Sequence, residues 1–329
     1  MTTIAVDVMG SDRDPSELLE GIAAALAADS ELSVLVVGAA EVVEPFCAQH
    51  DRAEALVAAE VIGMDEHPAT AVRKKKDASI VVAAKAVCDG RAQGLFSAGS
   101  TGAVLAAATF GVGRIKGIKR PALAAALPGL TGHPTVLLDL GANADVHEDA
   151  IVQFAVMGRA YAQVALGVAN PRVALLSNGS EETKGSEMAL GYHAALKESC
   201  EGFVGNAEGT DILAGTYDVI VGDGFTVNIA LKTLEGTAKF LVGRIKKAAG
   251  ESFLNKIGAG LLRSSLKSVA AELSGDAYGG AILLGLDAPV VKGHGSTSAE
   301  AVKNGTLAAA EAVRGELVDK IARAAGLAV

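Results

Sequence analysis

The chain alternates short runs of β-branched and apolar residues with longer alanine-rich stretches that have helical periodicity. We predict strands at residues 4–8, 33–37, 94–97, 135–139, 172–177, 217–221 and 281–284. Strands separated by helices in this rhythm are typical of a mainly parallel sheet that is covered by helices. The pattern therefore predicts a Rossmann-like, three-layer α/β/α fold in which residues 1–329 form one α/β domain.

Polar, glycine-rich loops follow five of the predicted strands. Their sequences are SAGSTGA (97–103), DLGANAD (139–145), SNGSEETKG (177–185), GDGFTVN (222–228) and KGHGSTS (292–298). In open parallel sheets, ligands bind beyond the carboxyl ends of the strands. We therefore expect these loops to converge at one edge of the sheet and to form a ligand site.

A helical pattern runs from residue 236 to residue 274, with a break near Gly250, and predicts a helical hairpin inserted in the domain. Between Lys239 and Lys267 it carries seven cations against one acid, Glu251, a net charge of +6 in a chain of −9. Its cations can dock an acidic protein, its apolar residues can enter an anionic bilayer, or it can mediate dimerisation with solvated lysines. The candidate contact residues are Arg244, Lys246, Lys247, Leu254, Lys256, Ile257, Leu261 and Arg263.

Composition narrows the class of protein. With 329 residues, 50% of them hydrophobic and 20% charged, the chain has the profile of a globular protein. The net charge of −9 disfavours nucleic acid as a partner. The three cysteines are scattered without a CxxC pair, which predicts a reducing cytoplasm and neither a disulfide framework nor a zinc site. No apolar run is long enough to span a bilayer, so we expect any membrane contact to be peripheral.

The best-known signatures of nucleotide and hydrolase sites are missing. No GxGxxG follows the first strand, and no GxxxxGK[ST], GxSxG or HExxH occurs in the chain. Dinucleotide, P-loop, serine-hydrolase and zinc-protease chemistry therefore have no positive support. We expect neither a metal nor an organic cofactor.

Two loops contain groups that suit a phosphate. In SAGSTGA, the glycines let the backbone approach an anion, and Ser100, Thr101 and the amide of Gly102 supply donors. Taken alone, this loop is equally consistent with a strand-to-helix turn in which Ser100 or Thr101 is the N-cap. His294, in KGHGSTS, can donate to phosphate or carry a proton, or it can simply hold a turn.

Nine ordered segments together resemble the bacterial phosphate acyltransferases of the PlsX type. They are IAVDVMGSD (4–12), MDEHPATAVRKKKDAS (64–79), SAGSTGA, VGRIKGIKRPA (112–122), DLGANAD, EETKG (181–185), GNAEGTD (205–211), GDGFTVN and KGHGS (292–296). The resemblance covers nearly the whole chain. It implies a fold similar to those of isocitrate and isopropylmalate dehydrogenases and of phosphotransacetylases.

The resemblance also implies a function. A long-chain fatty acyl group would pass from acyl carrier protein to inorganic phosphate, and the resulting acyl phosphate would enter phospholipid synthesis. The enzyme would be a homodimer whose product is used by a glycerol-3-phosphate acyltransferase. With the cysteine pattern and the missing membrane span, we expect it in the cytoplasm, peripherally associated with the membrane. One departure concerns the backbone: this chain has Val227 where the family usually has glycine, and a β-branched residue does not readily adopt a positive φ.

This chemistry suits the residues of the loops. Phosphate is itself the nucleophile, so the enzyme needs no activated serine or cysteine, but it must hold phosphate beside a thioester and stabilise an oxyanion. Lys184 is our candidate to neutralise the phosphate or the oxyanion. Asn143 and Asn228 are candidate neutral donors. With His294, these three are the predicted catalytic residues.

A second group of residues is predicted to bind phosphate or substrate, or to orient the groups that do. Alternatives remain for several of them: Lys184 can be a solvated lysine in the first turn of a helix, and Arg73 with residues 74–76 can be an exposed charged face. The acids are expected to orient cations and helix ends. The set is Ser100, Thr101, Gly102, Asp145, Glu208, Asp211, Asp223, Arg73 and Lys76.

Two other functions are open. A phosphotransacetylase-type enzyme would use an acyl-CoA, but the cationic hairpin argues against it because CoA needs no membrane platform. A non-catalytic, membrane-associated scaffold would leave the five polar loops unexplained.

Overall fold

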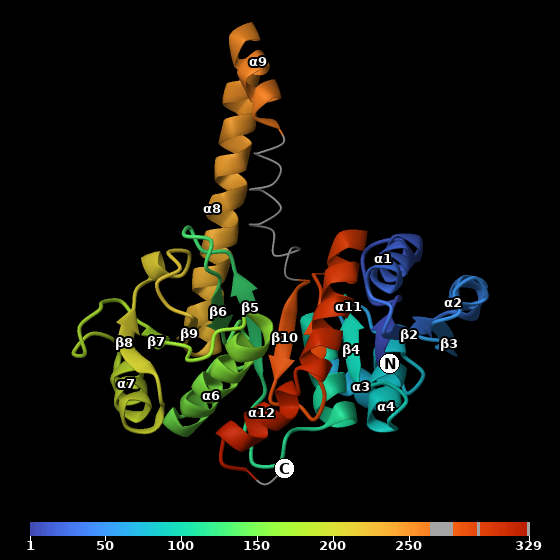
Figure 1. Ribbon diagram of the computed structural model, residues 1–329, viewed down its shortest axis with the longest axis horizontal. Helices are drawn as coiled ribbons and strands as arrows, with labels where there is room; N and C mark the ends of the chain where they lie inside the picture. The colour runs from blue at the N-terminus through green and yellow to red at the C-terminus, as the bar shows by residue number, and fades with distance from the viewer. Residues whose placement is uncertain (264–278, 295–296, 328–329) are drawn as a thin grey trace.

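The computed structural model describes residues 1–263, 279–294 and 297–327, without the side chains of Phe253 and Leu254. In this part of the chain one sheet has eleven strands, in the order β3-β2-β1-β4-β11-β10-β5-β6-β9-β7-β8 (Figure 1). The strands are β1 (Thr2–Asp7), β2 (Leu32–Gly38), β3 (Ala53–Val57), β4 (Gly94–Ser97), β5 (Ala122–Leu127), β6 (Thr135–Leu138), β7 (Val173–Leu176), β8 (Phe203–Ala207), β9 (Val219–Val221), β10 (Ala281–Leu284) and β11 (Val290–Lys292).

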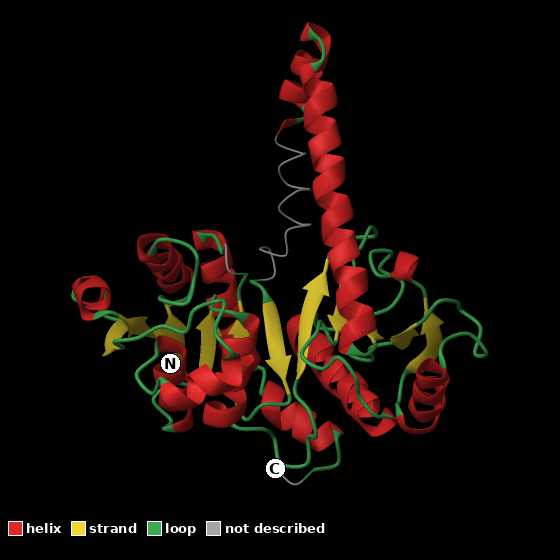
Figure 2. Cartoon of the chain, turned by 180° about the vertical axis from the view of Figure 1, so that it is seen from behind, coloured by secondary structure: helices red, strands yellow, loops and turns green. Residues whose placement is uncertain are grey.

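Helices cover both faces of this sheet (Figures 1 and 2). One face packs against α1 (Pro15–Ala28), α2 (Ala40–Cys47), α6 (Glu148–Ala165), α7 (Glu187–Ser199), α11 (Ala299–Arg314) and α12 (Leu317–Ala324). The other packs against α3 (Pro68–Lys74), α4 (Ser79–Cys88), α5 (Thr101–Ala107) and the start of α8 (Gly224–Gly250). Each interface encloses its own cluster of buried, mainly aliphatic side chains. The predicted three-layer α/β/α fold is confirmed.

All seven predicted strands are present, and four further strands escaped prediction: β3, β5, β8 and β11. β5 is the instructive case, because its sequence ALAAAL has the composition of a helix. It lies between two strands in the middle of the sheet and five of its six residues are buried. Strand pairing and burial therefore override the helical propensity of alanine.

The direction of the sheet reverses in its middle. β4 and β11 are parallel, but the next three pairs, β11–β10, β10–β5 and β5–β6, are antiparallel. β6, β9, β7 and β8 therefore run opposite to β1, β2, β3, β4 and β11. The expectation that all five polar loops leave one edge of the sheet is wrong, because it assumed that all strands share one direction.

The register nevertheless brings both sets of loops to the same level of the sheet. One row of paired residues runs across six strands: Phe96, Val291, Ile282, Ala124, Leu138 and Val221. β4 and β11 end one residue after this row, and β6 and β9 end at it from the opposite direction. The carboxyl ends of both halves thus meet along the middle of the sheet, where a site can use both.

The longest helix, α8, projects away from the sheet (Figures 1 and 2). It starts at Gly224, directly after the capping residue Asp223, and so begins well before the predicted hairpin start at residue 236. With 27 residues it is about 40 Å long. It ends at Gly250, and α9 (Phe253–Leu261) turns back beside it. Residues 264–274 of the predicted hairpin and the side chain of Leu254 lie outside the described residues.

Val227 does not need an unusual backbone. It lies in the first turn of α8, is fully buried, and is not among the residues with positive φ. A Cβ added at Gly222 would lie 2.8 Å from Val227 Cγ2, so the valine packs directly against the end of β9. The concern about its φ is resolved because the residue is helical.

Candidate active site

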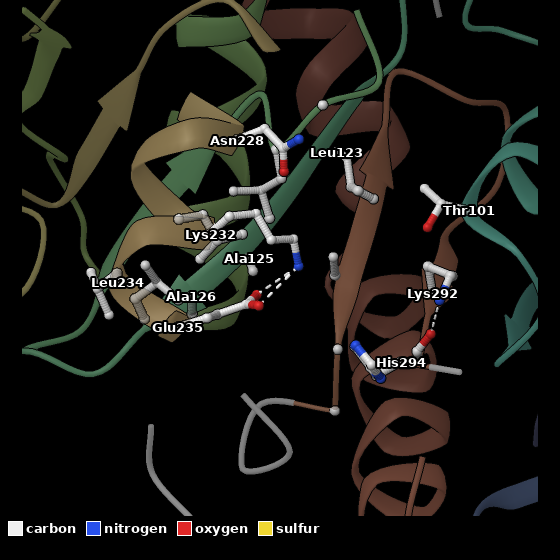
Figure 3. Close-up of a pocket in the computed structure, with 18 of the residues that line it drawn as sticks. Thr101, Leu123, Ala125, Ala126, Asn228, Lys232, Leu234, Glu235, Lys292 and His294 are labelled. Atoms are coloured by element: carbon white, nitrogen blue, oxygen red, sulfur yellow. Dashed lines mark hydrogen bonds and ion pairs between the residues drawn. The ribbon is translucent and has the colours of Figure 1, made fainter. Parts of the chain in front are cut away.

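A pocket of about 430 Å³ lies in the middle of the molecule, on the face of the sheet that α8 covers (Figure 3). β11, β10 and β5 contribute its floor, and the early turns of α8 contribute one wall. Cavities of this size are typical of sites for small molecules. Most of the lining is apolar, and its polar side chains are Thr101, Asn228, Lys232, Glu235, Lys292 and His294.

Thr101, Lys292 and His294 occupy one end of this pocket (Figure 3). Thr101 opens α5 shortly after β4, and Lys292 ends β11. Because Lys292 is paired with Ser97 in parallel strands, the two loops leave the sheet side by side. The sequence predicted that these loops converge, and for this pair the prediction is confirmed.

Ser100 has a structural use at the start of α5. Its Oγ accepts a hydrogen bond from the amide of Ala103 at 3.2 Å, so it is the N-cap of the helix. Thr101, the next residue, is exposed and lines the pocket. The hydroxyl of Thr101 is therefore the one that can meet a ligand.

Lys292 is the half-buried cation of this end. Burial lowers the pKa of its ammonium from 10.5 to about 8; the charge of Asp12 opposes the shift, and that of Lys232 adds to it. Its Nζ donates to the carbonyl of the adjacent Gly293. An ammonium with so little water around it interacts more strongly with an arriving anion than a surface lysine does.

The α8 wall places Asn228, Lys232 and Glu235 along one side of the pocket (Figure 3). Lys232 Nζ pairs with Glu235 Oε2 at 2.9 Å. Gly141, from DLGANAD, fits closely against this wall: its φ is 114°, and an added Cβ would lie 3.3 Å from Asn228 Cγ. A residue other than glycine at position 141 would be strained and would crowd Asn228.

The rest of the lining is aliphatic. Leucines from β5, from α8 and from the segment after the short 3₁₀ turn (Gly209–Asp211) surround small residues of β5 and β10. Such a surface favours hydrocarbon over polar groups. The pocket therefore suits an amphiphile that places an anionic or carbonyl end near Lys292. The main apolar contributors are Leu123, Ala125, Leu127, Leu213, Leu231, Leu234 and Ala281.

Two buried aspartates hold the loops around the pocket. Asp7 Oδ2 accepts a hydrogen bond from Ser97 Oγ at 2.8 Å, which joins the ends of β1 and β4. Asp139 accepts from the amides of Leu123 at 2.9 Å and Asn143 at 2.7 Å, which joins β5 to the DLGANAD loop. Burial raises the pKa of both carboxyl groups, against the hydrogen bonds that lower it.

Asn143 belongs to this scaffold. It is buried, and its Nδ2 donates to the carbonyl of Pro121 at 2.8 Å and to Asp139 Oδ2 at 2.9 Å. Both amide hydrogens are therefore used inside the loop. Asn143 lines none of the three pockets described in this section, whereas Asn228 lines the first.

A second pocket, of about 400 Å³, lies at the carboxyl ends of β7 and β9, between the first turns of α7 and α8. SNGSEETKG and GDGFTVN meet here, through Ser177, Asn178 and Asp223. Asp223 caps α8, accepting from the amide of Thr226 at 2.8 Å and from its hydroxyl at 2.9 Å. Its carboxylate orients a helix end, as predicted for the acids.

Lys184 is exposed and lines none of these pockets. A Cβ added at Gly179 would lie 2.8 Å from Lys184 Cγ, so the stem of the lysine packs on the loop itself. Asn206 anchors this loop by donating from Nδ2 to the carbonyls of Gly179 at 3.3 Å and Glu181 at 2.9 Å. The contact of Lys184 with phosphate stays a prediction.

Three other predicted acids lie outside the first pocket. Asp145 lines a third pocket, of about 430 Å³, which shares no lining residue with the first. Glu208 and Asp211 cap a 3₁₀ turn reciprocally, and Asp211 Oδ2 accepts from the amide of Glu208 at 2.8 Å. These two carboxylates hold a turn.

The basic segment before α4 forms an exposed face. The guanidinium of Arg73 lies 5.1 Å from the ring centroid of Phe110, and Lys76 is exposed. Gly102 has a packing role, because an added Cβ would lie 2.5 Å from Pro68 Cγ. This glycine lets α3 pack closely on α5.

Sequence reasoning missed Lys292 and Lys232. A usable signal existed for Lys292: it follows the apolar residues Val290 and Val291, so it ends a buried strand where a lysine cannot be fully solvated. For Lys232 the signal is weaker, since it lies four residues after Asn228 and hence on the same helical face. In KGHGSTS, the prediction selected His294 and passed over Lys292, the first residue of the same segment.

The described part of the hairpin exposes both apolar and cationic side chains. Phe240, Leu241, Ile257 and Leu261 are exposed large apolar residues, Leu261 to 80%. None of the predicted hairpin cations forms an ion pair with a described residue, and all are exposed: Arg244, Lys246, Lys247, Lys256 and Arg263.

Two other features are absent from the described residues. No helix there combines the length and the hydropathy that a membrane span requires. No three histidine, cysteine, aspartate or glutamate side chains there come close enough together to hold a metal ion.

Comparison with known proteins gives one consistent result. A family model described as "Fatty acid synthesis protein" matches residues 2–320. The phosphate acyltransferase of Heliobacterium modesticaldum is 46% identical over 97% of this chain and 96% of that protein. The phosphate acyltransferase of Levilactobacillus brevis is 48% identical over 92% of this chain and 89% of that protein.

Solved structures support the fold. A phosphotransacetylase from Streptococcus pyogenes superposes with a TM-score of 0.60 at 17% identity, over 95% of this chain and 94% of its own. The EutD phosphotransacetylase from Staphylococcus aureus gives a TM-score of 0.58 at 18% identity, over the same shares. The predicted likeness to the phosphotransacetylase fold is confirmed.

Proposed function

This chain belongs to the phosphate acyltransferase family, and we propose that it moves a long-chain fatty acyl group from acyl carrier protein to inorganic phosphate, giving acyl phosphate for phospholipid synthesis. One observation carries the proposal beyond the family: the first pocket joins the Lys292 ammonium to an aliphatic floor. The reaction needs both, because one substrate is an anion and the other carries a hydrocarbon chain.

In the proposed mechanism, Lys292 and the Thr101 hydroxyl hold phosphate. A phosphate oxygen attacks the thioester carbonyl carbon, so that a C–O bond forms and the C–S bond breaks. The proton of monohydrogen phosphate ends on the released thiol. Lys292 is charged at neutral pH, since its pKa is about 8, and it neutralises charge on phosphate and on the tetrahedral oxyanion.

Asn228 and His294 line the same pocket and are proposed as further donors to the phosphate or the oxyanion. Lys184 is proposed as a second cation that reaches the site from its exposed loop. Lys184→Ala then lowers kcat/KM for phosphate about tenfold or more, the cost of one charged contact, without changing the melting temperature. Near-normal turnover removes Lys184 from the mechanism.

The hairpin supports the choice of donor and the place of action. Exposed cations on α8 and α9 complement an acidic carrier protein, and the apolar residues among them suit an anionic bilayer. We propose a cytoplasmic enzyme that is peripheral to the membrane. There a glycerol-3-phosphate acyltransferase consumes the acyl phosphate, which is a reactive mixed anhydride with a lipid tail.

A homodimer is part of the same proposal. Phe225 and Ile229 lie one turn apart on α8, with 64% and 51% of their surfaces exposed, and an apolar face of this kind suits a second copy. Phe225→Asp with Ile229→Asp shifts the light-scattering mass to that of one chain. An unchanged mass assigns the dimer to another surface.

A donor panel tests the function. The protein is incubated with labelled phosphate and palmitoyl carrier protein, palmitoyl-CoA or acetyl-CoA, and acyl phosphate is measured. We expect the highest kcat/KM with the carrier protein. Preference for acetyl-CoA supports a phosphotransacetylase-type enzyme instead. If no donor gives acyl phosphate, the non-catalytic scaffold is the remaining alternative.

A further inference from the structure

Three neighbouring strands in the middle of the sheet each leave a single residue incompletely buried. In β5 this is Ala125, in β10 it is Ala281 and in β11 it is Lys292, while all their other residues are buried. All three line the first pocket. Incomplete burial in strands that are otherwise closed marks the place where the pocket opens onto the sheet.

The register puts these residues in one row. Ala281 is paired with Lys292, and Ala281 precedes Ile282, which is paired with Ala124, so Ala281 lies beside Ala125. The open positions therefore form a trough that crosses the strands, with Lys292 at one end. Since strands lie about 4.8 Å apart, Ala281 is about 5 Å and Ala125 about 10 Å from the β11 backbone.

The walls of the trough are leucines. Leu123 and Leu127 lie two positions to either side of Ala125 and so share its face of the sheet, and Leu231 and Leu234 come from α8. The charged side chains on the α8 side, Lys232 and Glu235, neutralise each other in an ion pair. Beyond Lys292 the floor of the trough therefore offers methyl groups and no charge.

We propose that this trough holds the acyl chain of the donor, with the thioester at Lys292, and that Ala281 and Ala125 determine which chain lengths are accepted. The inference rests on the proposed function. A straight saturated chain fits a floor made of alanine methyl groups in one line, and the leucine walls exclude bulky substituents. A larger side chain at either alanine closes the trough at a defined distance from the reacting carbon.

The test uses acyl donors of graded length. Wild type, Ala125→Leu and Ala281→Leu are assayed with acetyl, octanoyl and palmitoyl thioesters and labelled phosphate. Ala125→Leu lowers kcat/KM for palmitoyl about 30-fold and changes acetyl less than about threefold, because overfilling a packed site costs only the ligand that needs the space. Ala281→Leu, which is closer to Lys292, lowers kcat/KM for the octanoyl thioester as well.

Controls separate the possible failures. Ala55→Leu makes the same change at a half-buried alanine of the edge strand β3 and leaves all three rates unchanged. If a leucine variant does not fold, Ala125→Val and Ala281→Val add less volume and suit a strand. If wild type forms no acyl phosphate from any of the three donors, the proposed function is overturned. An active wild type whose variants lose all chain lengths equally, or none, overturns the trough.

Discussion

The charge of the Lys292 side chain is the property of the proposed site that depends most on pH. Its pKa lies near 8 because burial penalises the ammonium, so the charged form is present below pH 8 and is lost above it. A surface lysine would keep its charge to much higher pH. The pocket thus makes its own cation dependent on pH in the range where proteins are assayed.

This predicts a pH profile. For wild type, kcat/KM for phosphate falls as pH rises through about 8, because neutral lysine no longer attracts the dianion. In Lys292→Arg the guanidinium stays charged, so the fall of kcat/KM at alkaline pH moves beyond the measurable range even if the variant is slower. Initial rates between pH 6 and about 10 provide the measurement. The same fall in both proteins would assign it to another group.

Gly141 allows a prediction about stability. Its φ of 114° and its contact with Asn228 mean that Gly141→Ala lowers the free energy of unfolding by about 1–3 kcal/mol. Gly236→Ala is the control: it lies in α8 with nothing within 4 Å of the added carbon, and gains up to about 1 kcal/mol. Urea unfolding measures both. Equal effects would show that the backbone at Gly141 is not the cause.

Single residues show where sequence reasoning stops. The glycine-rich loops pointed to Thr101, His294 and Asn228, and the structure brings these three into one pocket. The prediction passed over Lys292, because β11 itself was not predicted and the lysine was therefore assigned to a loop, although the apolar Val290 and Val291 before it were a usable signal. Asn143 matched the motif equally well, yet both hydrogens of its side-chain amide are bonded to Asp139 and Pro121.

Among helices and strands, α8 connects the pocket with the surface that we propose for membrane contact. Its first turns line the pocket, and its far end, with α9, carries the exposed cations and apolar residues of the hairpin. Figure 1 shows that this end projects away from the sheet. A continuous helix of 27 residues keeps these ends about 40 Å apart. This length separates the pocket from the proposed membrane contact at the far end of α8.

Flotation with anionic vesicles tests the membrane contact. In the double variant Ile257→Glu and Leu261→Glu the vesicle-bound fraction falls about tenfold or more, because two apolar contacts are replaced by like charges. Val204→Glu, at a half-exposed position of β8, is the matched control and floats like wild type. Equal flotation of the double variant would remove the hairpin from membrane binding.

The helices and strands also show how far the pattern of apolar residues predicts secondary structure. Most of the predicted strands are rich in valine, isoleucine and leucine, whereas β11, with only Val290 and Val291 before its lysine, was too short to be recognised. β5 was missed because ALAAAL is as good a helix as a strand in isolation, and its pairing with β10 and β6 is not visible in its letters. The start of α8 was also missed, because GDGFTVN reads as a loop until Asp223 is seen as a cap.

Across the full chain, the layers and the mainly parallel sheet followed from the order of elements, but the reversal of strand direction did not. That reversal depends on β5, β10 and β11, of which the sequence revealed only one. The reversal places the carboxyl ends of both halves along one row of the sheet, and the pocket draws Thr101 from one half and Asn228 from the other. A site that spans the sheet in this way suits a reaction between two substrates.

The most direct test is the rate of acyl phosphate formation from palmitoyl carrier protein and labelled phosphate in wild type and in Lys292→Ala. The account predicts that wild type forms acyl phosphate and that the variant is slower by a factor of about 100 or more, with an unchanged melting temperature. Equal rates in two equally stable proteins would contradict it, because the pocket on β11, β10 and β5 would then not be where phosphate reacts.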